Sequence, residues 1–236
     1  MKSLIIVMSF ISVIPVPKRF IPEWNEQTLK YFCPMLAVSG LVFGLLWQCL
    51  WLILPLRLRG FIMMLLTLAL TGGLHTDGLM DTCDAVFSRR DRDTRLKILS
   101  DTHAGSFAVM GCVIILTAKT LLFTELPAHS TDIFFIPVYS RFGMAIMLNV
   151  LPFAKSNGLA VMLGASRDKR NNIFFALMSV MLFVSGGRII ACAFWVCLAL
   201  WCRMCVKIFG GITGDLLGAF VEVSEAVMLG VMVCCI

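Results

Sequence analysis

Charged side chains are scarce in this sequence. Only 14% of its 236 residues are Asp, Glu, Lys or Arg, whereas 59% are hydrophobic, and the mean hydropathy is +0.92. So few charges cannot cover the surface of a water-soluble domain, and several apolar runs approach the length of a bilayer span. The composition excludes a soluble globular protein and predicts an all-α, polytopic integral membrane helix bundle.

The sequence also lacks the clustered Cys and His residues of a zinc or redox site. Its ten cysteines include a single C-x-x-C, Cys202 to Cys205, with no second such pair and no His cluster beside it. In a membrane span, Cys serves mostly as a small apolar residue. The cysteines therefore indicate neither zinc nor redox chemistry.

The apolar runs predict about seven transmembrane helices in one membrane-embedded domain, residues 1–236. The first sixteen residues form a shorter run that ends at Pro15 and Pro17. This run predicts an interfacial or re-entrant helix rather than a cleaved signal peptide, because no A-x-A-like site follows it. The expected spans lie near residues 33–54, 60–74, 104–126, 133–153, 173–187, 189–205 and 216–236.

Basic residues indicate which loops face the cytoplasm. Fifteen Lys and Arg lie in the N-terminal region, the loop after residue 74, the loop 154–172 and the segment around Lys207. The opposite loops hold three: Arg57, Arg59 and Arg188. Such a bias is typical of a multi-pass protein of the cell (inner) membrane. It explains the net charge of +6 better than a nucleic-acid partner does.

One polar stretch, residues 72–101, interrupts the apolar sequence on the predicted cytoplasmic side. It contains six of the nine aspartates: Asp77, Asp81, Asp84, Asp91, Asp93 and Asp101. The first three are spaced i, i+4 and i+7, so a helix over residues 77–86 would place them on one face. Like charges this close repel unless a cation lies among them. The spacing predicts a divalent-metal site with hard oxygen ligands, and the alternative is a solvated helix face.

Neighbouring residues suggest what this site could bind. Gly72, Gly73 and Gly78 either let a ligand approach the backbone or let helices pack closely. His75 could be a general base, a phosphate contact, a metal ligand or a hydrogen-bonded polar residue. Five basic residues follow directly: Arg89, Arg90, Arg92, Arg95 and Lys97. Most of them are expected to face water or lipid headgroups. Together with a metal, such a cluster would suit the binding of a di- or triphosphate.

Further ionisable residues lie within apolar runs. Asp215, Glu222 and Glu225 occur in a second polar island, residues 210–225, and such carboxylates are costly in a membrane unless they serve a site. Lys119 and Arg141 also lie in apolar segments, where the default is a functional or ion-paired residue. The alternatives are that Lys119 reaches toward the interface and that Arg141 binds a backbone carbonyl.

These motifs together resemble one family. Four stretches are similar to those of cobalamin synthases, the adenosylcobinamide-GDP ribazoletransferases. They are GGLHTDGLMDTCDA, the Arg-rich segment leading to Asp101 and Gly105, GGITGDLLGAFVEVSE and the N-terminal FISVIPVP. The likeness spans the whole chain, and Ala85 departs from it where the family usually has Gly. The resemblance implies a membrane enzyme that joins adenosylcobinamide-GDP to α-ribazole or its 5′-phosphate, releases GMP and requires Mg²⁺.

The resemblance also implies residue roles. The Mg²⁺ ligands would be Asp77, Asp81, Asp84 and Asp101, joined by Asp215, Glu222 and Glu225. A ribose hydroxyl would attack the phosphorus on the cobinamide arm, and Asp81 or Asp84 could take its proton. His75 is a further catalytic candidate. The candidate substrate contacts are Gly73, Arg90, Arg92, Lys119, Arg141, Thr213 and Gly214.

Two other functions are compatible with parts of the pattern. A phospholipid synthase that releases CMP would need a similar acidic face, but its signature has an Ala-Arg pair where Ala85 and Val86 stand here. A cation or proton transporter could use the intramembrane carboxylates with Lys119 and Arg141, but this leaves the arginine cluster unexplained. The substrates, the bilayer and a second copy of the chain in a homo-oligomer are the expected partners.

Overall fold

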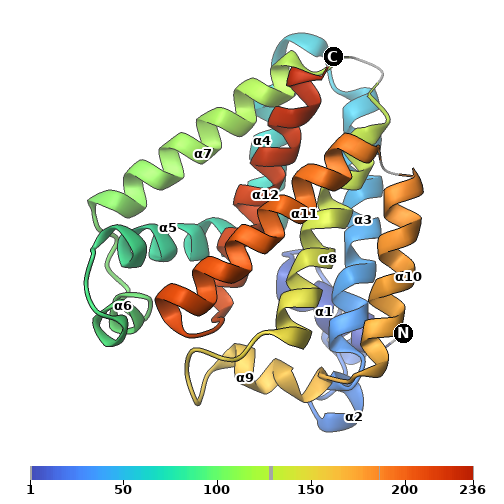
Figure 1. Ribbon diagram of the computed structural model, residues 1–236. Coiled ribbons are helices and arrows are strands. Elements are labelled where there is room, and N and C mark those ends of the chain that lie inside the picture. The colour runs from blue at the N-terminus through green and yellow to red at the C-terminus, as the bar shows by residue number, and fades with distance from the viewer. Residues whose placement is uncertain (1, 128–129, 186, 236) are drawn as a thin grey trace.

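The computed structural model describes residues 2–127, 130–185 and 187–235, and in these ranges the chain is built of helices (Figure 1). An isolated bridge between Phe153 and Ile212 joins two of the loops. The α-helices are α1 (Lys2–Ile11), α2 (Glu26–Leu29), α3 (Phe32–Ile53), α4 (Arg59–Thr71), α5 (Leu74–Phe87), α6 (Arg92–Ile98), α7 (Ser106–Glu125), α8 (Phe135–Val150), α9 (Leu159–Leu163), α10 (Arg170–Ser185), α11 (Arg188–Met204) and α12 (Gly214–Cys234).

Five helical segments of the described ranges are long and apolar enough to cross a membrane. They contain α3, α7, α8, α11 and α12, and the bent pair α4 and α5 would make a sixth. The multi-pass helix bundle is therefore confirmed, whereas the count of seven is not. Helices α1 and α10 are apolar but shorter. Residues 186 and 236, within the expected spans 173–187 and 216–236, lie outside the described residues.

A sharp corner separates α4 from α5. Gly72 and Gly73 have φ angles of 60° and 76°, a left-handed conformation that glycine adopts without the steric cost of a Cβ atom. Their amides donate to the carbonyls of Ala69 and Leu68, which ends α4. As a result α5 leaves at 91° to α4 (Figure 1). The two glycines therefore form the turn that starts the acidic helix.

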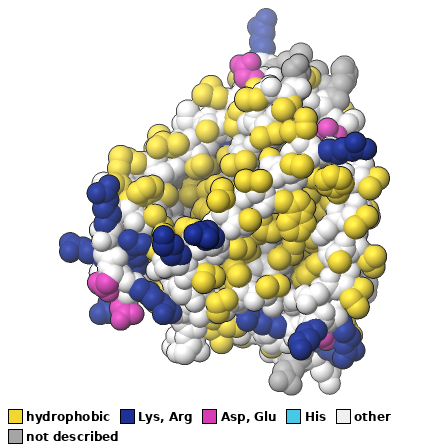
Figure 2. Space-filling view, in the orientation of Figure 1, with side chains coloured by type: hydrophobic (Ala, Val, Ile, Leu, Met, Phe, Trp, Pro, Cys, Tyr) yellow, Lys and Arg dark blue, Asp and Glu magenta, His cyan; other side chains and the backbone are white. Residues whose placement is uncertain are grey.

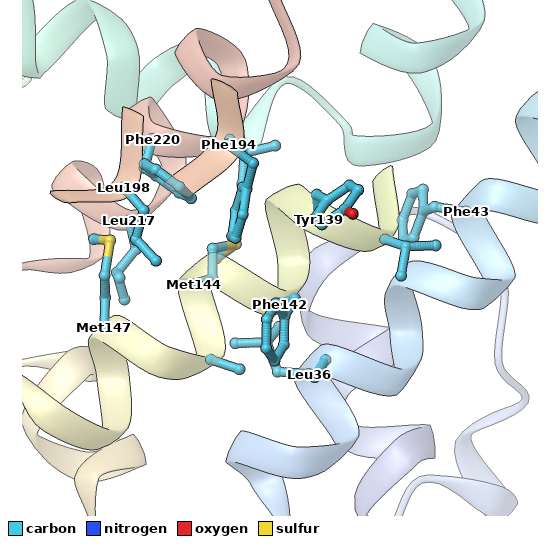
Figure 3. Packing of buried hydrophobic residues seen from close by; sticks show 14 of the residues in the cluster. Leu36, Phe43, Tyr139, Phe142, Met144, Met147, Phe194, Leu198, Leu217 and Phe220 are labelled. Carbon is cyan, nitrogen blue, oxygen red and sulfur yellow. The ribbon is translucent and has the colours of Figure 1, made fainter. Parts of the chain in front are cut away.

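Helix α8 lies at the centre of the bundle, against α3, α11 and α12. Figure 3 shows Phe142 of α8 beside Leu36 of α3, and it shows Phe194 of α11 close to Met144. The Phe142 and Phe194 rings are 6.1 Å apart. Close packing of this kind supplies much of the association energy of membrane helices, because lipid is as apolar as the side chains.

The outer surface agrees with a membrane environment. Figure 2 shows a broad face of hydrophobic side chains, with most of the Lys and Arg in this view at its edges. Large apolar residues of α7 and α10, such as Ile114 and Val184, are mostly exposed at 65% and 78%. Such exposure would be unfavourable in water, whereas lipid tails cover it without cost.

Candidate active site

The acidic face of α5 forms as the spacing predicted. Helix α5 extends from Leu74 to Phe87 and so includes the expected helix 77–86. Asp77 is exposed, whereas Asp81 and Asp84 are partly buried. Asp81 lies within electrostatic reach of four other carboxylates, those of Asp77, Asp84, Asp101 and Asp215. The fold therefore groups the first acidic motif with one residue of the second.

Close contact between α5 and α12 brings Asp215 to this face. A Cβ atom added at Gly78 would lie 2.7 Å from the backbone oxygen of Asp215, so only glycine permits this approach. Thr213 caps α12, since its Oγ1 accepts a hydrogen bond from the Leu216 amide at 3.3 Å. The same hydroxyl donates to Asp215 Oδ2 at 3.2 Å. Thr213 therefore orients a carboxylate of the site.

Asp84 is tied to the start of α7. Its Oδ2 accepts a hydrogen bond from the Gly105 amide at 2.6 Å, and its Oδ1 accepts one from the Ala108 amide at 2.9 Å. Both donors belong to the unpaired amides at a helix N-terminus, which also attracts negative charge. Asp84 therefore caps α7, a role that the spacing of residues does not predict, because Gly105 is 21 residues away in the chain.

Asp101 lies in the exposed loop between α6 and α7. Its Oδ1 accepts a hydrogen bond from the His103 amide at 3.0 Å and lies 2.7 Å from the His103 Nδ1 atom. These hydrogen bonds from the His103 side chain and backbone hold the pKa of Asp101 below its ordinary value. No motif in the sequence predicts this role of His103, and its position two residues after Asp101 is the one local signal for the contact.

The donor chemistry suits Mg²⁺, but the arrangement is open. Asp77, Asp81 and Asp215 offer only hard carboxylate oxygens, which are the ligands that Mg²⁺ prefers. Within the described ranges, no three Asp, Glu, His or Cys side chains converge closely enough to hold one ion as they stand. Magnesium binding therefore stays a prediction, supported by the type of donor and by the grouping of carboxylates around Asp81.

Glu222 and Glu225 form a buried ion cluster with the two cations of the apolar runs. Lys119 Nζ donates to Glu222 Oε2 at 2.8 Å and to Glu225 Oε2 at 2.7 Å. Arg141 Nη1 donates to Glu225 Oε1. Each of the four residues is at most 2% exposed. Lys119 does not reach toward the interface, and Arg141 binds a carboxylate rather than a backbone carbonyl.

The ion cluster also contacts α5. Thr76 Oγ1 donates to Glu222 Oε1 at 3.1 Å, which links α5 to α12, while Lys119 adds α7 and Arg141 adds α8. Because their oxygens already bind these donors, the geometry favours a supporting role for both glutamates over metal ligation. The same burial separates Lys119 and Arg141 from the exposed carboxylate face, so they are poorly placed for a phosphate.

The arginines after α5 differ in their surroundings. Arg90 is exposed. Arg92 Nε donates to the Phe209 carbonyl at 2.8 Å, which connects α6 to the end of the π-helical turn Cys205–Phe209 that follows α11. Lys155 belongs to the basic loop 154–172, where its position alone predicts no site role. Its Nζ donates to Ser100 Oγ and its charge acts on Asp215. Lys155 is therefore a cation that the fold places near Asp215.

Three cavities adjoin the carboxylates. An open one of about 600 Å³ is lined by Gly73, Thr76 and Asp77, among others. A second of about 160 Å³ includes Lys155, Thr213, Gly214 and Asp215 in its wall. The third, of about 90 Å³, contains His75, Asp77, Gly214 and Asp215 in an otherwise apolar lining. The expected substrate contacts Gly73, Thr213 and Gly214 thus border space that a ligand can enter.

Comparison with known proteins gives a consistent family. A family model described as cobalamin-5-phosphate synthase matches residues 3–233. The adenosylcobinamide-GDP ribazoletransferase of Halalkalibacterium halodurans is 30% identical, over 98% of this chain and 95% of its own length. The proteins of that name from Geobacillus thermodenitrificans and Synechococcus are each 32% identical, over 97% and 93% of this chain and 94% and 91% of their own lengths. No solved structure matches the chain.

Proposed function

Because the chain belongs to the cobalamin-5-phosphate synthase family, we propose that it is a membrane-embedded transferase that joins adenosylcobinamide-GDP to α-ribazole or its 5′-phosphate. The products are GMP and adenosylcobalamin or its 5′-phosphate, in a late step of cobalamin biosynthesis. The family match covers nearly the whole chain, and the acidic face lies within the matched residues. The grouping of Asp81 with four other carboxylates is the structural observation that carries the proposal.

The reaction is a phosphoryl transfer to an alcohol. A ribose hydroxyl oxygen bonds to the phosphorus attached to cobinamide, the bond from that phosphorus to the bridging oxygen breaks, and GMP leaves with this oxygen. Mg²⁺, when bound by Asp77, Asp81 and Asp215, would offset the negative charge of the diphosphate. We infer that this all-oxygen set from two helices is the metal site.

A carboxylate must accept the hydroxyl proton. Both oxygens of Asp84 already accept amide hydrogen bonds at the start of α7, so this residue is held in place by α7. Asp81, in contrast, accepts no hydrogen bond from any described residue, and its side chain is only partly buried. We therefore propose an Asp81 carboxylate oxygen as the proton acceptor and Asp84 as the residue that fixes the α5 face against α7.

Cations at the cytoplasmic edge would bind the phosphates. Arg90 is exposed, and Lys155 lies near Asp215, where the ammonium keeps N–H donors for a charged group besides its hydrogen bond to Ser100. Arg92 contributes less, because its guanidinium binds the Phe209 carbonyl. The same reasoning removes Lys119 and Arg141 from direct substrate contact, since both are buried in the ion cluster. The bias of basic loops supports a cytoplasmic active site in the inner membrane.

Product analysis on membranes containing this chain tests the proposal. With adenosylcobinamide-GDP, α-ribazole 5′-phosphate and Mg²⁺, we expect GMP and a complete corrinoid. Chelation of the metal, or the double substitution Asp77→Ala with Asp81→Ala, should abolish both products. Asp93→Ala is the matched control and should retain activity, because Asp93 is exposed on α6 and is not among the carboxylates that act on Asp81.

Two outcomes would contradict the proposal in different ways. Release of CMP from a CDP-alcohol, with no GMP from adenosylcobinamide-GDP, would assign the chain to lipid phosphotransfer. Turnover that continues unchanged after metal removal would keep the transferase and remove Mg²⁺ from its mechanism.

A further inference from the structure

Two loops, residues 151–158 and 210–213, meet beside the second acidic motif. The first connects α8 to α9, and the second leads into α12. The Ala154 amide donates to the Ile212 carbonyl at 3.0 Å, and the Ile212 amide donates to the Pro152 carbonyl at 2.8 Å. A backbone pairing this short is marginal by itself, so the junction needs further support to keep one geometry.

Arg92 supplies this support from α6. Its Nε donates to the Phe209 carbonyl, directly before the second loop, at 2.8 Å, and its Nη2 donates to the Ala154 carbonyl in the first loop at 3.4 Å. The guanidinium also lies against Gly210, where an added Cβ atom would collide with it. A planar guanidinium carries its N–H donors in a fixed fork, so it can hold two carbonyls at a set separation. One side chain therefore clamps both loops.

The clamped loops carry charged groups of the site. Lys155 follows Ala154 directly, and its charge acts on Asp215 near the start of α12. Both residues line the cavity of about 160 Å³. Just beyond the other end of α6, Ser100 accepts a hydrogen bond from the Lys155 ammonium. Helix α6 thus holds this half of the site near both of its ends, through Arg92 and Ser100.

Helix α6 is also tied to the first acidic motif. It packs against α5, directly below it in Figure 1. Asp101, in the loop after α6, lies within electrostatic reach of Asp81 on α5, as Asp215 does. The clamp therefore connects the two acidic motifs through one short helix. A shift of the loops relative to α6 would move Asp215 away from its place near Asp81.

We propose that Arg92 is a positioning residue of the transferase. By clamping the two loops it sets where Asp215 and Lys155 stand relative to Asp81, and it acts through backbone carbonyls rather than through the substrate. This inference rests on the proposed function, because the placement of these groups matters to catalysis only if they bind metal and phosphate. It replaces the substrate contact that the sequence analysis expected for Arg92.

Kinetics of Arg92→Gln separate the two roles. The shorter side chain cannot span both carbonyls, so we expect kcat for GMP release to fall roughly tenfold or more as Asp215 is displaced. The KM for adenosylcobinamide-GDP should change less than about twofold, whereas loss of a direct phosphate contact would raise it. Arg92→Lys keeps the charge but loses the planar fork, so it should not restore kcat. Arg203→Gln is the matched control, because Arg203 is exposed in the last turn of α11.

Hydrogen–deuterium exchange of the detergent-purified protein gives a readout that needs no turnover. The Ala154 and Ile212 amides are bonded across the junction, so their exchange reports whether the loops stay paired. In Arg92→Gln, peptides from the two loops should exchange at least roughly tenfold faster, whereas peptides from the central helix α8 should keep the wild-type rate. The unchanged α8 shows that the variant is folded. Arg203→Gln should leave the exchange of both loops unchanged.

The two readouts separate this inference from the proposed function. Faster loop exchange in Arg92→Gln supports the clamp even if the wild-type protein forms no GMP and the proposed function fails. Loop exchange that stays at the wild-type rate overturns the inference, whatever the kinetics. A raised KM for adenosylcobinamide-GDP with unchanged kcat also overturns it, as does full recovery of kcat in Arg92→Lys, because both results would assign the guanidinium to a substrate phosphate.

Discussion

Single residues decide how this protein accommodates charge inside an apolar bundle. Lys119 and Arg141 balance Glu222 and Glu225, and all four side chains are almost completely buried. Two carboxylates and two cations leave the cluster with no net charge, which makes its burial tolerable. The cluster also positions α5 through Thr76, although it lies away from the exposed carboxylates.

Removing one cation from this cluster should destabilise the protein. Lys119→Met leaves Glu222 buried without its charged partner, and we expect a loss of about 3 kcal/mol or more in the free energy of unfolding. The measurement is thermal unfolding in detergent, with the exposed Lys97→Met as control. Adding Glu222→Gln to Lys119→Met should recover part of the loss. A Lys119→Met protein that unfolds at the wild-type temperature would refute the pairing.

Asp84 should show separable contributions to stability and to metal affinity. Asp84→Ala removes the cap of α7 and should cost about 1 kcal/mol, whereas Asp84→Asn keeps one acceptor oxygen and should cost less. Both substitutions remove a negative charge from the group around Asp81, so both should raise the Mg²⁺ concentration needed for half-maximal GMP release. Equal unfolding temperatures for the two variants would argue against the capping role.

At the scale of helices, the contact between α5 and α12 assembles the site. The two helices approach so closely at Gly78 that its Cα lies against the backbone of Asp215. At the N-terminal end of α5, the corner at Gly72 and Gly73 sets the direction in which α5 leaves α4. Asp77, Asp81 and Asp215 therefore depend on three glycines for their mutual position.

Adding one methyl group at this contact should impair activity. In Gly78→Ala the new Cβ would lie 2.7 Å from the Asp215 oxygen, so α5 and α12 must separate. We expect Mg²⁺-dependent GMP release to fall at least roughly tenfold, because misplacement by about 1 Å strongly slows a positioned reaction. Gly230→Ala in α12 is the control, since its nearest atom beyond the helix backbone is 4.0 Å away. Full activity in Gly78→Ala would show that the helices are not held this closely.

At the scale of the whole molecule, charge asymmetry predicts the orientation. The loops predicted to face the cytoplasm hold fifteen basic residues, and the loops predicted to lie on the opposite side hold three. Reporter fusions measure this directly. A fusion after Asn157 should give fluorescent green fluorescent protein and inactive alkaline phosphatase, whereas a fusion after Arg57 should give the reverse. The opposite pattern would place the carboxylates outside the cytoplasm, where the proposed substrates are not made.

The sequence alone determined the class of the molecule and the local geometry of its acidic motif. Apolar runs of near-bilayer length require a membrane, and the spacing of Asp77, Asp81 and Asp84 puts them on one face of any helix that contains them. The family resemblance was also available from the motifs. All of these properties are local, because they depend on residues within one or two helical turns or on the composition of one segment.

Only the tertiary structure decided which distant residues meet. Glu222 pairs with Lys119 across 103 positions in the chain, and Asp84 caps a helix that begins 22 residues later. The spacing of residues along the chain cannot reveal such partners, because they depend on how helices cross. The same holds for the cavity beside His75, which exists only where several helices leave space between them. The sequence alone indicated the carboxylates. Helix packing determines which of them lie at the exposed face and which lie in the buried ion cluster.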